Sequence, residues 1–259
     1  MRMMKKVLGT VTVLALSVSL LAGCGSTAVS PVSSTASTAA ESTTSSVVSE
    51  TTSAAADENA AAAAQLLNDL TGSYQELWPV ILADEYQQTW LDDCTALVGE
   101  ENAEAAFEKL SSMVTGDVYG EDAVEAYANG GGAYFCGFTN DLATLTFDGE
   151  TSTISGTDKD GNVLFSHTYH YIGMEPVHGL YEFESDDADS GEFTYFFLAP
   201  DTSAETYHIE FRYGSDAEAL SQYDAGEYAY WLASGISTDC DQTMIDNCIE
   251  LFCTENLAG

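Results

Sequence analysis

The chain has 259 residues, with 42 acidic side chains against 6 basic ones and a formal net charge of −36 at pH 7. This charge excludes a nucleic-acid-binding protein, because contacts to phosphates need clustered Lys or Arg. It also argues against docking to anionic lipid through charge. Hydrophobic residues make up 45% of the chain and aromatic residues 11%, which is enough for a packed core.

The first 23 residues have the features of a bacterial lipoprotein signal peptide. A short basic start is followed by an apolar run over residues 7–21, which is shorter than the about 20 apolar residues of a membrane span. The run ends in Leu21-Ala-Gly-Cys24, which resembles the lipobox, whose cysteine thiol receives diacylglycerol. The alternative is an ordinary signal peptide with an incidental cysteine. We expect lipid attachment at Cys24, and hence a protein anchored on the extracytoplasmic face of the cell membrane.

Residues 24–56 are almost entirely Ser, Thr, Ala and Val, and only Glu41 and Glu50 are charged. Such a segment cannot bury enough surface to offset its ordering entropy. We therefore predict a disordered tether over residues 24–56, followed by one folded domain over residues 57–259.

The folded part is predicted to be mainly β with flanking helices, an α+β chain. Helix-favouring composition and periodicity indicate helices over residues 57–70, 76–97 and 102–113. From Ala133 onward the apolar pattern alternates with a period of two, and Asp-Gly pairs mark turns. About seven strands are indicated, among them residues 142–147, 151–155, 163–172, 179–184, 193–198 and 206–213. Helices return over residues 216–223 and 241–252, and the regular spacing of the strands favours an antiparallel barrel or sandwich.

Several segments resemble the ZinT (YodA) family of zinc-binding domains. Asp69-Leu-Thr-Gly-Ser-Tyr-Gln-Glu-Leu-Trp-Pro79 is similar to the family's opening motif. The densest match is Phe196-Phe-Leu-Ala-Pro200 followed by Tyr207-His-Ile-Glu-Phe-Arg-Tyr-Gly-Ser-Asp216. There the family reads D-H-I-I-A-P and then H-F-H-I-F-x-G-x-D. Shorter similarities occur at Tyr169-His-Tyr-Ile-Gly173 and Gly179-Leu-Tyr-Glu-Phe-Glu184, so the resemblance covers about residues 65–253.

The resemblance implies a lipocalin-like antiparallel β-barrel that captures zinc or cadmium and assists the binding protein of a zinc ABC importer. In the family, three histidines bind zinc. Here Phe196 stands at the first position, Thr206 or Glu205 at the second, and only His208 matches the third. Zinc needs three or four nitrogen, sulfur or oxygen ligands. We therefore expect weakened or lost zinc binding, with any residual metal site formed by His208 and Glu205.

His208 has two interpretations. If residues 206–213 form a strand, Thr206, His208 and Glu210 lie on one face. His208 is then either a metal ligand or a hydrogen-bonded histidine in a domain that no longer binds metal. Further ligands are available only if the barrel brings them close, the candidates being His170, His178, Glu175 and Glu184. His167 and His170 should point to opposite sides of a strand.

Five cysteines follow Cys24, namely Cys94, Cys136, Cys240, Cys248 and Cys253. An exported protein can form disulfides, and an odd number leaves at least one thiol unpaired within the chain. Cys248 and Cys253 are five residues apart on a predicted helix, so we do not expect them to pair with each other. One of them can face Cys94 or Cys136, and the connectivity stays open.

Two other functions remain open. The first is a metal-free barrel that binds a small ligand or a partner protein through the aromatic run Tyr223, Tyr228, Tyr230 and Trp231, which can also pack to close one end. The second is a surface enzyme acting on glycans or peptides through paired carboxylates. No G-x-S-x-G, H-E-x-x-H or phosphate-loop motif is present. The sequence therefore favours a lipoprotein without catalytic activity.

Overall fold

The structure is a computed structural model that describes residues 58–199, 206 and 208–258. The predicted signal peptide, the tether with Cys24, and Glu205 lie outside these residues. Within the described ranges, no helix combines the length and the apolar character that crossing a bilayer requires.

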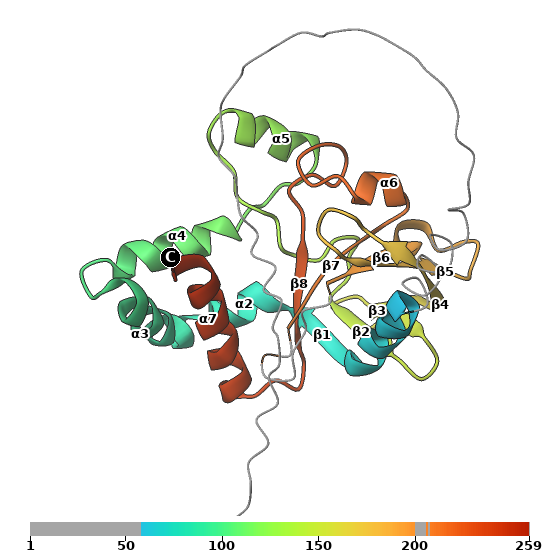
Figure 1. The fold of residues 1–259 in the computed structure, drawn as a ribbon, viewed down its shortest axis with the longest axis horizontal. Helices are drawn as coiled ribbons and strands as arrows, with labels where there is room; N and C mark the ends of the chain where they lie inside the picture. The colour runs from blue at the N-terminus through green and yellow to red at the C-terminus, as the bar shows by residue number, and fades with distance from the viewer. Residues whose placement is uncertain (1–57, 200–205, 207, 259) are drawn as a thin grey trace, which may run out of the picture. The chain divides into compact units, whose positions relative to one another are not determined.

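Eight antiparallel strands close into a barrel, in which consecutive strands pair and β1 completes the ring with β8 (Figure 1). The strands are β1 (Gly72–Glu76), β2 (Thr144–Asp148), β3 (Thr153–Thr157), β4 (Val163–Met174), β5 (Tyr181–Ser185), β6 (Tyr195–Leu198), β7 (His208–Gly214) and β8 (Ala233–Ser237). Closure leaves neither edge of the sheet unpaired. The expected lipocalin-like β-barrel with flanking helices is confirmed.

The barrel interior is filled by aromatic side chains. In β7, alternation directs Phe211 and Tyr213 inward, and both are fully buried. The ring of Tyr213 stacks on that of Phe196 with centroids 5.3 Å apart, and meets the ring of Trp231 edge-on at 4.9 Å. Phe165 stacks on Phe193 at 3.9 Å. These ring contacts occupy space that a ligand-binding barrel would leave open.

A helix over residues 58–69 adds to the barrel core. Ala63, Leu66, Leu67 and Leu70 follow the spacing of one helical face and belong to the same buried cluster as the barrel aromatics. The turn after β2 approaches this helix so closely that a Cβ on Gly149 would lie 2.4 Å from the Cα of Asn68. Only glycine fits there without moving the helix.

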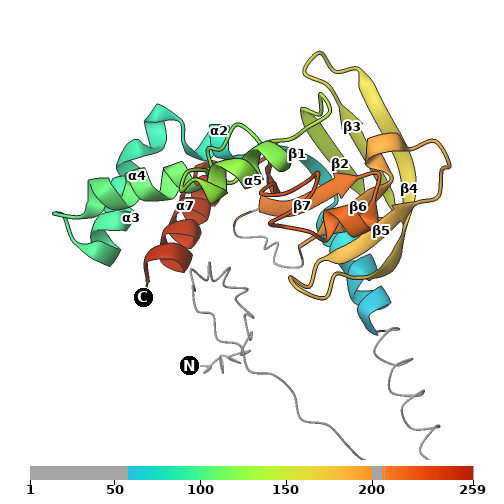
Figure 2. The same cartoon turned by 90° about the horizontal axis from the view of Figure 1, so that it is seen from above.

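A second core is formed by helices that pack on the outside of the barrel (Figure 2). The helices are α2 (Leu77–Ile81), α3 (Gln87–Val98), α4 (Ala103–Met113) and α7 (Gln242–Leu257). Trp90 of α3 is fully buried and its indole N–H donates to the carbonyl of Ile81 at 2.7 Å. Asp241 caps α7 by accepting from the backbone N–H of Met244 at 3.0 Å. Ile236 of β8 belongs to this cluster, so the helices cover the outer face of that strand.

The structure divides one predicted helix and contains three elements that the sequence did not predict. Residues 76–97 do not form one helix, because the chain leaves helical geometry at Ala83, whose φ and ψ are −60° and 147°. Residues Asp84–Tyr86 then form a 3-10 turn before α3. β1 and β8 were not predicted, and neither was α5 (Glu121–Ala128). All five residues of β8, Ala-Ser-Gly-Ile-Ser, are buried, so its sequence has no alternation to reveal a strand.

The segment between β7 and β8 is held against the barrel by Arg212. This side chain is fully buried and donates to the backbone carbonyls of Leu220, Gln222 and Tyr228. Its guanidinium also lies 4.2 Å from the centre of the Tyr223 ring. The segment includes α6 (Ala217–Leu220). Tyr228 and Trp231 join the barrel core, in agreement with the packing interpretation of the aromatic run.

Candidate functional site

His208 begins β7 and lies on the outer face of the barrel wall. Ile209 and Phe211 point into the core, so His208 and Glu210 point out. In the register with β8, His208 lies opposite Ile236, a member of the helical core. The predicted sharing of one face by His208 and Glu210 is therefore what the structure shows.

A small hollow lies between this face of β7 and helices α2 and α7. His208 and Glu210 line it from the strand, and Cys248 and Glu255 line it from α7, with apolar walls from Leu77, Trp78, Ile81, Leu251 and Phe252. Its volume is about 30 Å³, and a cavity needs at least about 10–15 Å³ to hold a water molecule. The hollow therefore has room for a cation or a water molecule and not for an organic ligand.

Thr206 positions the imidazole of His208. The Thr206 hydroxyl oxygen is 2.6 Å from Nδ1 of His208, while the thiol of Cys248 donates to the carbonyl of Thr206 at 3.2 Å. A histidine that binds metal through one ring nitrogen usually has the other held by a hydrogen bond. When Nδ1 donates to Thr206, Nε2 carries the lone pair. Through its contacts with His208 and Cys248, Thr206 links the start of β7 to α7.

The donor set at the hollow is incomplete for zinc. Burial, and then the proximity of Cys240, raises the pKa of Cys248 to about 12, so a metal ion would have to displace the proton of this thiol to bind it. The thiolate is the form that binds metal. One imidazole and carboxylates remain. Among the residues that the structure describes, no three or more His, Cys, Asp or Glu side chains are arranged to hold a metal ion.

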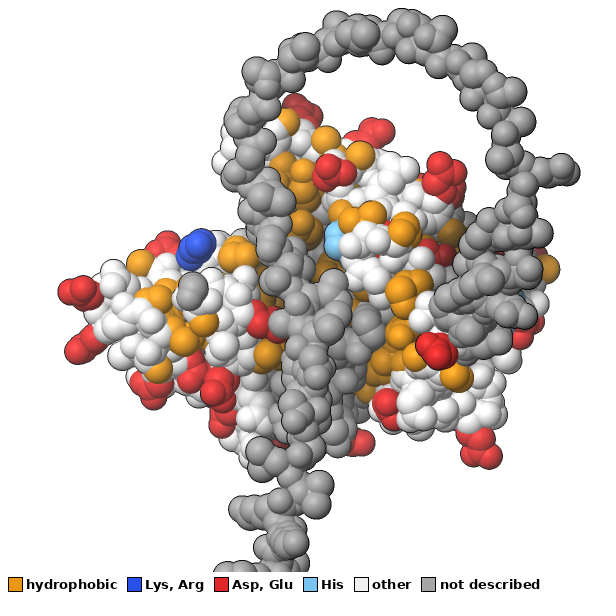
Figure 3. All heavy atoms as spheres, in the orientation of Figure 1, with side chains coloured by type: hydrophobic (Ala, Val, Ile, Leu, Met, Phe, Trp, Pro, Cys, Tyr) orange, Lys and Arg blue, Asp and Glu red, His pale blue; other side chains and the backbone are white. Residues whose placement is uncertain are grey.

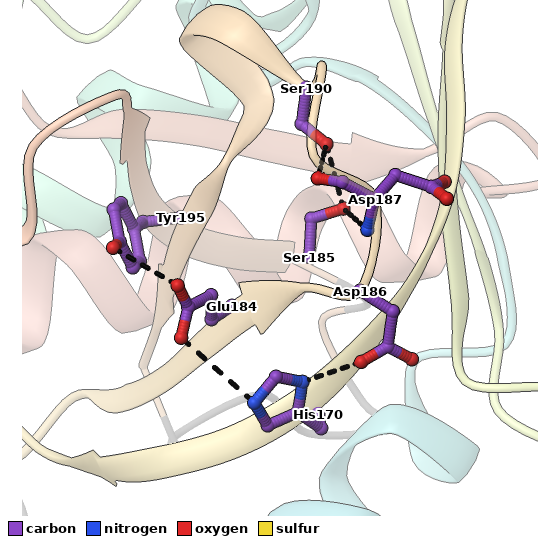
Figure 4. Close-up of polar contacts among 7 residues, drawn as sticks. All are labelled: His170, Glu184, Ser185, Asp186, Asp187, Ser190 and Tyr195. Carbon is purple, nitrogen blue, oxygen red and sulfur yellow. Dashed lines mark hydrogen bonds and ion pairs between the residues drawn. The ribbon is translucent and has the colours of Figure 1, made fainter.

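His170 is engaged by carboxylates elsewhere (Figure 4). Its Nδ1 is 2.7 Å from Oδ1 of Asp186, and its Nε2 is 3.9 Å from Oε2 of Glu184. The other oxygen of Glu184 accepts from the hydroxyl of Tyr195 at 3.1 Å. His167 lies on the other side of β4, as predicted, with Nδ1 2.8 Å from Oδ2 of Asp187. These histidines are paired with acids and do not line the hollow at His208.

His178 and Glu175 form a different cluster. Glu175 is fully buried and accepts from the backbone N–H groups of Val177 and His178 at 2.8 Å and 2.6 Å. The ring of His178 lies 3.7 Å from that of Tyr223, whose face also contacts Arg212. Neither residue lines the hollow at His208, so they do not add ligands to it.

Phe196 occupies the first histidine position of the family motif and points into the barrel. It is fully buried, and its ring contacts those of Tyr169, Phe211 and Tyr213. His208 lies on the opposite face of the barrel wall. In this structure the two positions therefore cannot share one ion.

Comparison with known proteins gives a likeness in fold. No family model matches the sequence, and no curated protein matches it. The Zn(II)-bound ZinT-like domain of Streptococcus pneumoniae AdcA is 16% identical, with a TM-score of 0.45 over 71% of this chain and 89% of that one. Zn(II)-bound AdcA itself is 15% identical with a TM-score of 0.42 over 72% of this chain, which spans only 35% of AdcA.

The barrel domain carries a strongly acidic surface. Asp and Glu side chains are spread over the face shown in Figure 3, whereas Lys and Arg are sparse. The described residues include three Lys or Arg, of which Arg212 is fully buried and Lys109 and Lys159 are exposed. A surface of one sign concentrates cations near it. Cations are therefore favoured near the hollow, although this attraction does not select zinc.

Sequence reasoning named His208 and Glu205 as candidate ligands and placed Glu210 on the same face as His208, but it missed the α7 side of the hollow. Cys248 and Glu255 lie 40 and 47 positions after His208 in the chain, and no short-range pattern links them to it. Trp78 could have been noticed from the sequence, because it lies in the segment that resembles the family's opening motif. Its place in the wall of the hollow depends on how α2 packs on β7.

Proposed function

We propose that this chain is a lipid-anchored, extracytoplasmic protein whose ZinT-like barrel binds one divalent cation weakly at His208 and has no catalytic activity. The hollow at His208 carries the proposal: a small cavity with an imidazole held by Thr206 and carboxylates at its border. Glu205, three residues before His208 in the sequence, is the further ligand we propose. Zinc is the cation that imidazole and carboxylate ligands suit.

The proposed role is support of zinc uptake beside the binding protein of a zinc ABC importer. It derives from the family motifs in the sequence, with affinity reduced because Phe196 and Thr206 stand at histidine positions. A weak site suits transfer of an ion to a partner, since an ion held loosely leaves quickly. We expect no activity on glycans or peptides.

Zinc binding is expected to be weak and to depend on His208. For the full chain we expect one saturable site with a dissociation constant of about 1 µM, equivalent to roughly −8 kcal/mol. His208→Ala removes the only imidazole at the hollow and should weaken binding at least about tenfold. Equilibrium dialysis with zinc, under reducing conditions and at fixed ionic strength, measures both values.

The matched control is His170→Ala, which removes an exposed histidine that also lies among carboxylates. This variant should bind zinc as the wild type does. Equal loss in both variants would show diffuse binding to the acidic surface. No saturable binding, or an unchanged constant in His208→Ala, would remove the metal role. Glu205→Gln tests the further ligand in the same way.

The anchor has its own test. Cells that express the chain and are given a labelled fatty acid should incorporate the label into the protein, and Cys24→Ala should abolish it. The other cysteines provide the control, because Cys136→Ala should retain the full label. Absence of label on the wild-type chain would contradict lipid anchoring without bearing on the hollow.

A metal-free role is the second candidate. The filled barrel interior argues against an enclosed organic ligand, so a partner protein is the form of this alternative that the structure favours. Apolar side chains are exposed along β4 and the turn after it, namely Val163 at 70%, Ile172 at 40% and Val177 at 73%. Exposed apolar groups of this kind are common at protein interfaces. A zinc titration with no His208-dependent binding would leave this alternative in place.

A further inference from the structure

Two buried thiols face each other between α3 and α7. The sulfurs of Cys94 and Cys253 are 3.9 Å apart, although the two residues are separated by 159 positions in the chain. Both side chains are fully buried and both thiols are free. The two helices pack directly against each other, so the sulfurs meet inside an established interface and not at a mobile surface.

The distance is short enough for a covalent bond after a small movement. An S–S bond is about 2.05 Å long, so the sulfurs need to approach by about 1.9 Å. The other buried thiols contact backbone oxygens: Cys136 donates to the carbonyl of Tyr134 at 3.9 Å and Cys248 to that of Thr206 at 3.2 Å. Cys94 and Cys253 are the sulfur pair that the described residues bring together.

We propose that Cys94 and Cys253 form a disulfide bond in the exported protein. The oxidant is a disulfide of the extracytoplasmic space, either a small molecule or a thiol oxidoreductase. The thiolate of one cysteine attacks it, forming a mixed disulfide and releasing one oxidant thiol. The second cysteine, after losing its proton, attacks the protein sulfur of that mixed disulfide and releases the other oxidant thiol. The oxidant gains two electrons and two protons, and the chain loses them.

The environment of the two thiols determines when the bond forms. Burial raises the pKa of Cys94, and burial together with the neighbouring Cys94 and Asp93 raises that of Cys253. Since the thiolate is the reactive species, exchange is slow once α3 and α7 have packed. Oxidation therefore belongs to folding after export, and the finished bond is shielded from reductants.

The bond would fix the helix that borders the hollow. Cys248 of α7 lies five residues before Cys253 and lines the hollow beside His208. Linking α7 to α3 restricts its movement relative to β7. The proposal requires export to an oxidising compartment but does not depend on metal binding.

Peptide mapping of the full chain tests the bond. The reduced, denatured chain is refolded in a buffer of oxidised and reduced glutathione, free thiols are alkylated, and the protein is cleaved after glutamate. Cleavage isolates Cys94 in residues 86–100 and Cys253 in residues 251–255, apart from Cys248. We expect these two peptides to be linked, with a mass two hydrogens below their sum. The same linkage is expected in chain isolated from the cell surface.

The control variant changes Cys136, whose thiol contacts the carbonyl of Tyr134, and the test variant changes Cys94. Cys136→Ala should keep the linked peptides, and Cys94→Ala should lose them. Reduction should lower the melting temperature of the wild type and of Cys136→Ala by about 5–10 °C, and leave that of Cys94→Ala unchanged. Alkylation of both Cys94 and Cys253 in the refolded wild type, or linkage of Cys94 to Cys240 or Cys136, would overturn the proposal.

Discussion

Phe196→Ala is expected to lower the free energy of unfolding by about 3–5 kcal/mol, the range for removal of a buried phenylalanine ring. Phe196 is fully buried, and its ring contacts those of Phe211, Tyr213 and Tyr169 inside the closed barrel. A closed barrel of eight strands cannot collapse around the lost ring as a surface loop can. Urea unfolding of the wild type and the variant, followed by tryptophan fluorescence, measures the difference.

Val163→Ala is the control for this substitution. Val163 lies on the same barrel at the start of β4 but is 70% exposed, so its change should stay within about 0.5 kcal/mol. If Phe196→Ala also changed stability by less than about 1 kcal/mol, the barrel interior would not be the packed aromatic core described above. A cavity able to accept a ligand would then return as an explanation of function.

Phe196→His separates stability from metal binding. The substitution restores the histidine found in the family motif but places an imidazole among aromatic rings, on the opposite face of the wall from His208. We therefore expect a loss of stability similar to that of Phe196→Ala and no gain in zinc affinity. Tighter zinc binding by this variant would show that residues near β6 and β7 rearrange around the ion. The proposal of a weak site confined to the outer face would then be wrong.

The barrel could be predicted from the sequence because most of its strands have one buried face. Leu145 and Phe147 alternate with threonines in β2, and Ile209, Phe211 and Tyr213 alternate with polar residues in β7. Such alternation marks a wall between an apolar interior and water. It fails in β8, where helices cover the outer face, so that Ala233 in the barrel core and Ile236 in the helical core are both buried. Because both faces of β8 are covered, periodicity could not show this strand.

The candidate site divides in the same way. The alternation of β7 placed His208 and Glu210 on one face, because that information is local. The neighbours of His208 across the hollow, and of Cys94 across the helical interface, come from α7 at the other end of the chain. Contacts of this separation depend on how whole layers pack, and residue types alone do not fix them. The sequence therefore predicted strand β7 and the face on which His208 lies, and the structure was needed to show which residues of α7 contact His208 and Cys94.

The buried Arg212 binds the segment between β7 and β8 to the barrel. It lies on the outer face of β7, in the same row as His208 and Glu210, and the segment between β7 and β8 covers it. Burial lowers its pKa, with Tyr223 and Glu175 acting in the opposite direction. An arginine nevertheless stays charged in a protein. Its three carbonyl partners all lie in the covering segment, so one side chain fixes that segment on the barrel.

Arg212→Met is expected to lower the free energy of unfolding by about 3–5 kcal/mol, as the loss of one partner from a buried charge network does. The methionine fills part of the volume but leaves the carbonyls of Leu220, Gln222 and Tyr228 without their charged donor. The covering segment should open first. Hydrogen exchange over residues 215–231 should therefore increase by more than exchange in β2 and β3, and urea unfolding gives the global loss.

Two further variants decide whether hydrogen-bond geometry or charge is responsible. Lys109→Met removes the same charge from an exposed position on α4 and should change stability by less than about 0.5 kcal/mol. Arg212→Lys keeps the charge but replaces the planar guanidinium by a single ammonium on a shorter reach, so it should recover less than half of the loss. Full recovery with lysine would show that charge alone holds the segment. If hydrogen exchange increased equally throughout the barrel in Arg212→Met, Arg212 would support the whole fold. A side chain that fixes only residues 215–231 leaves exchange in the distant strands unchanged.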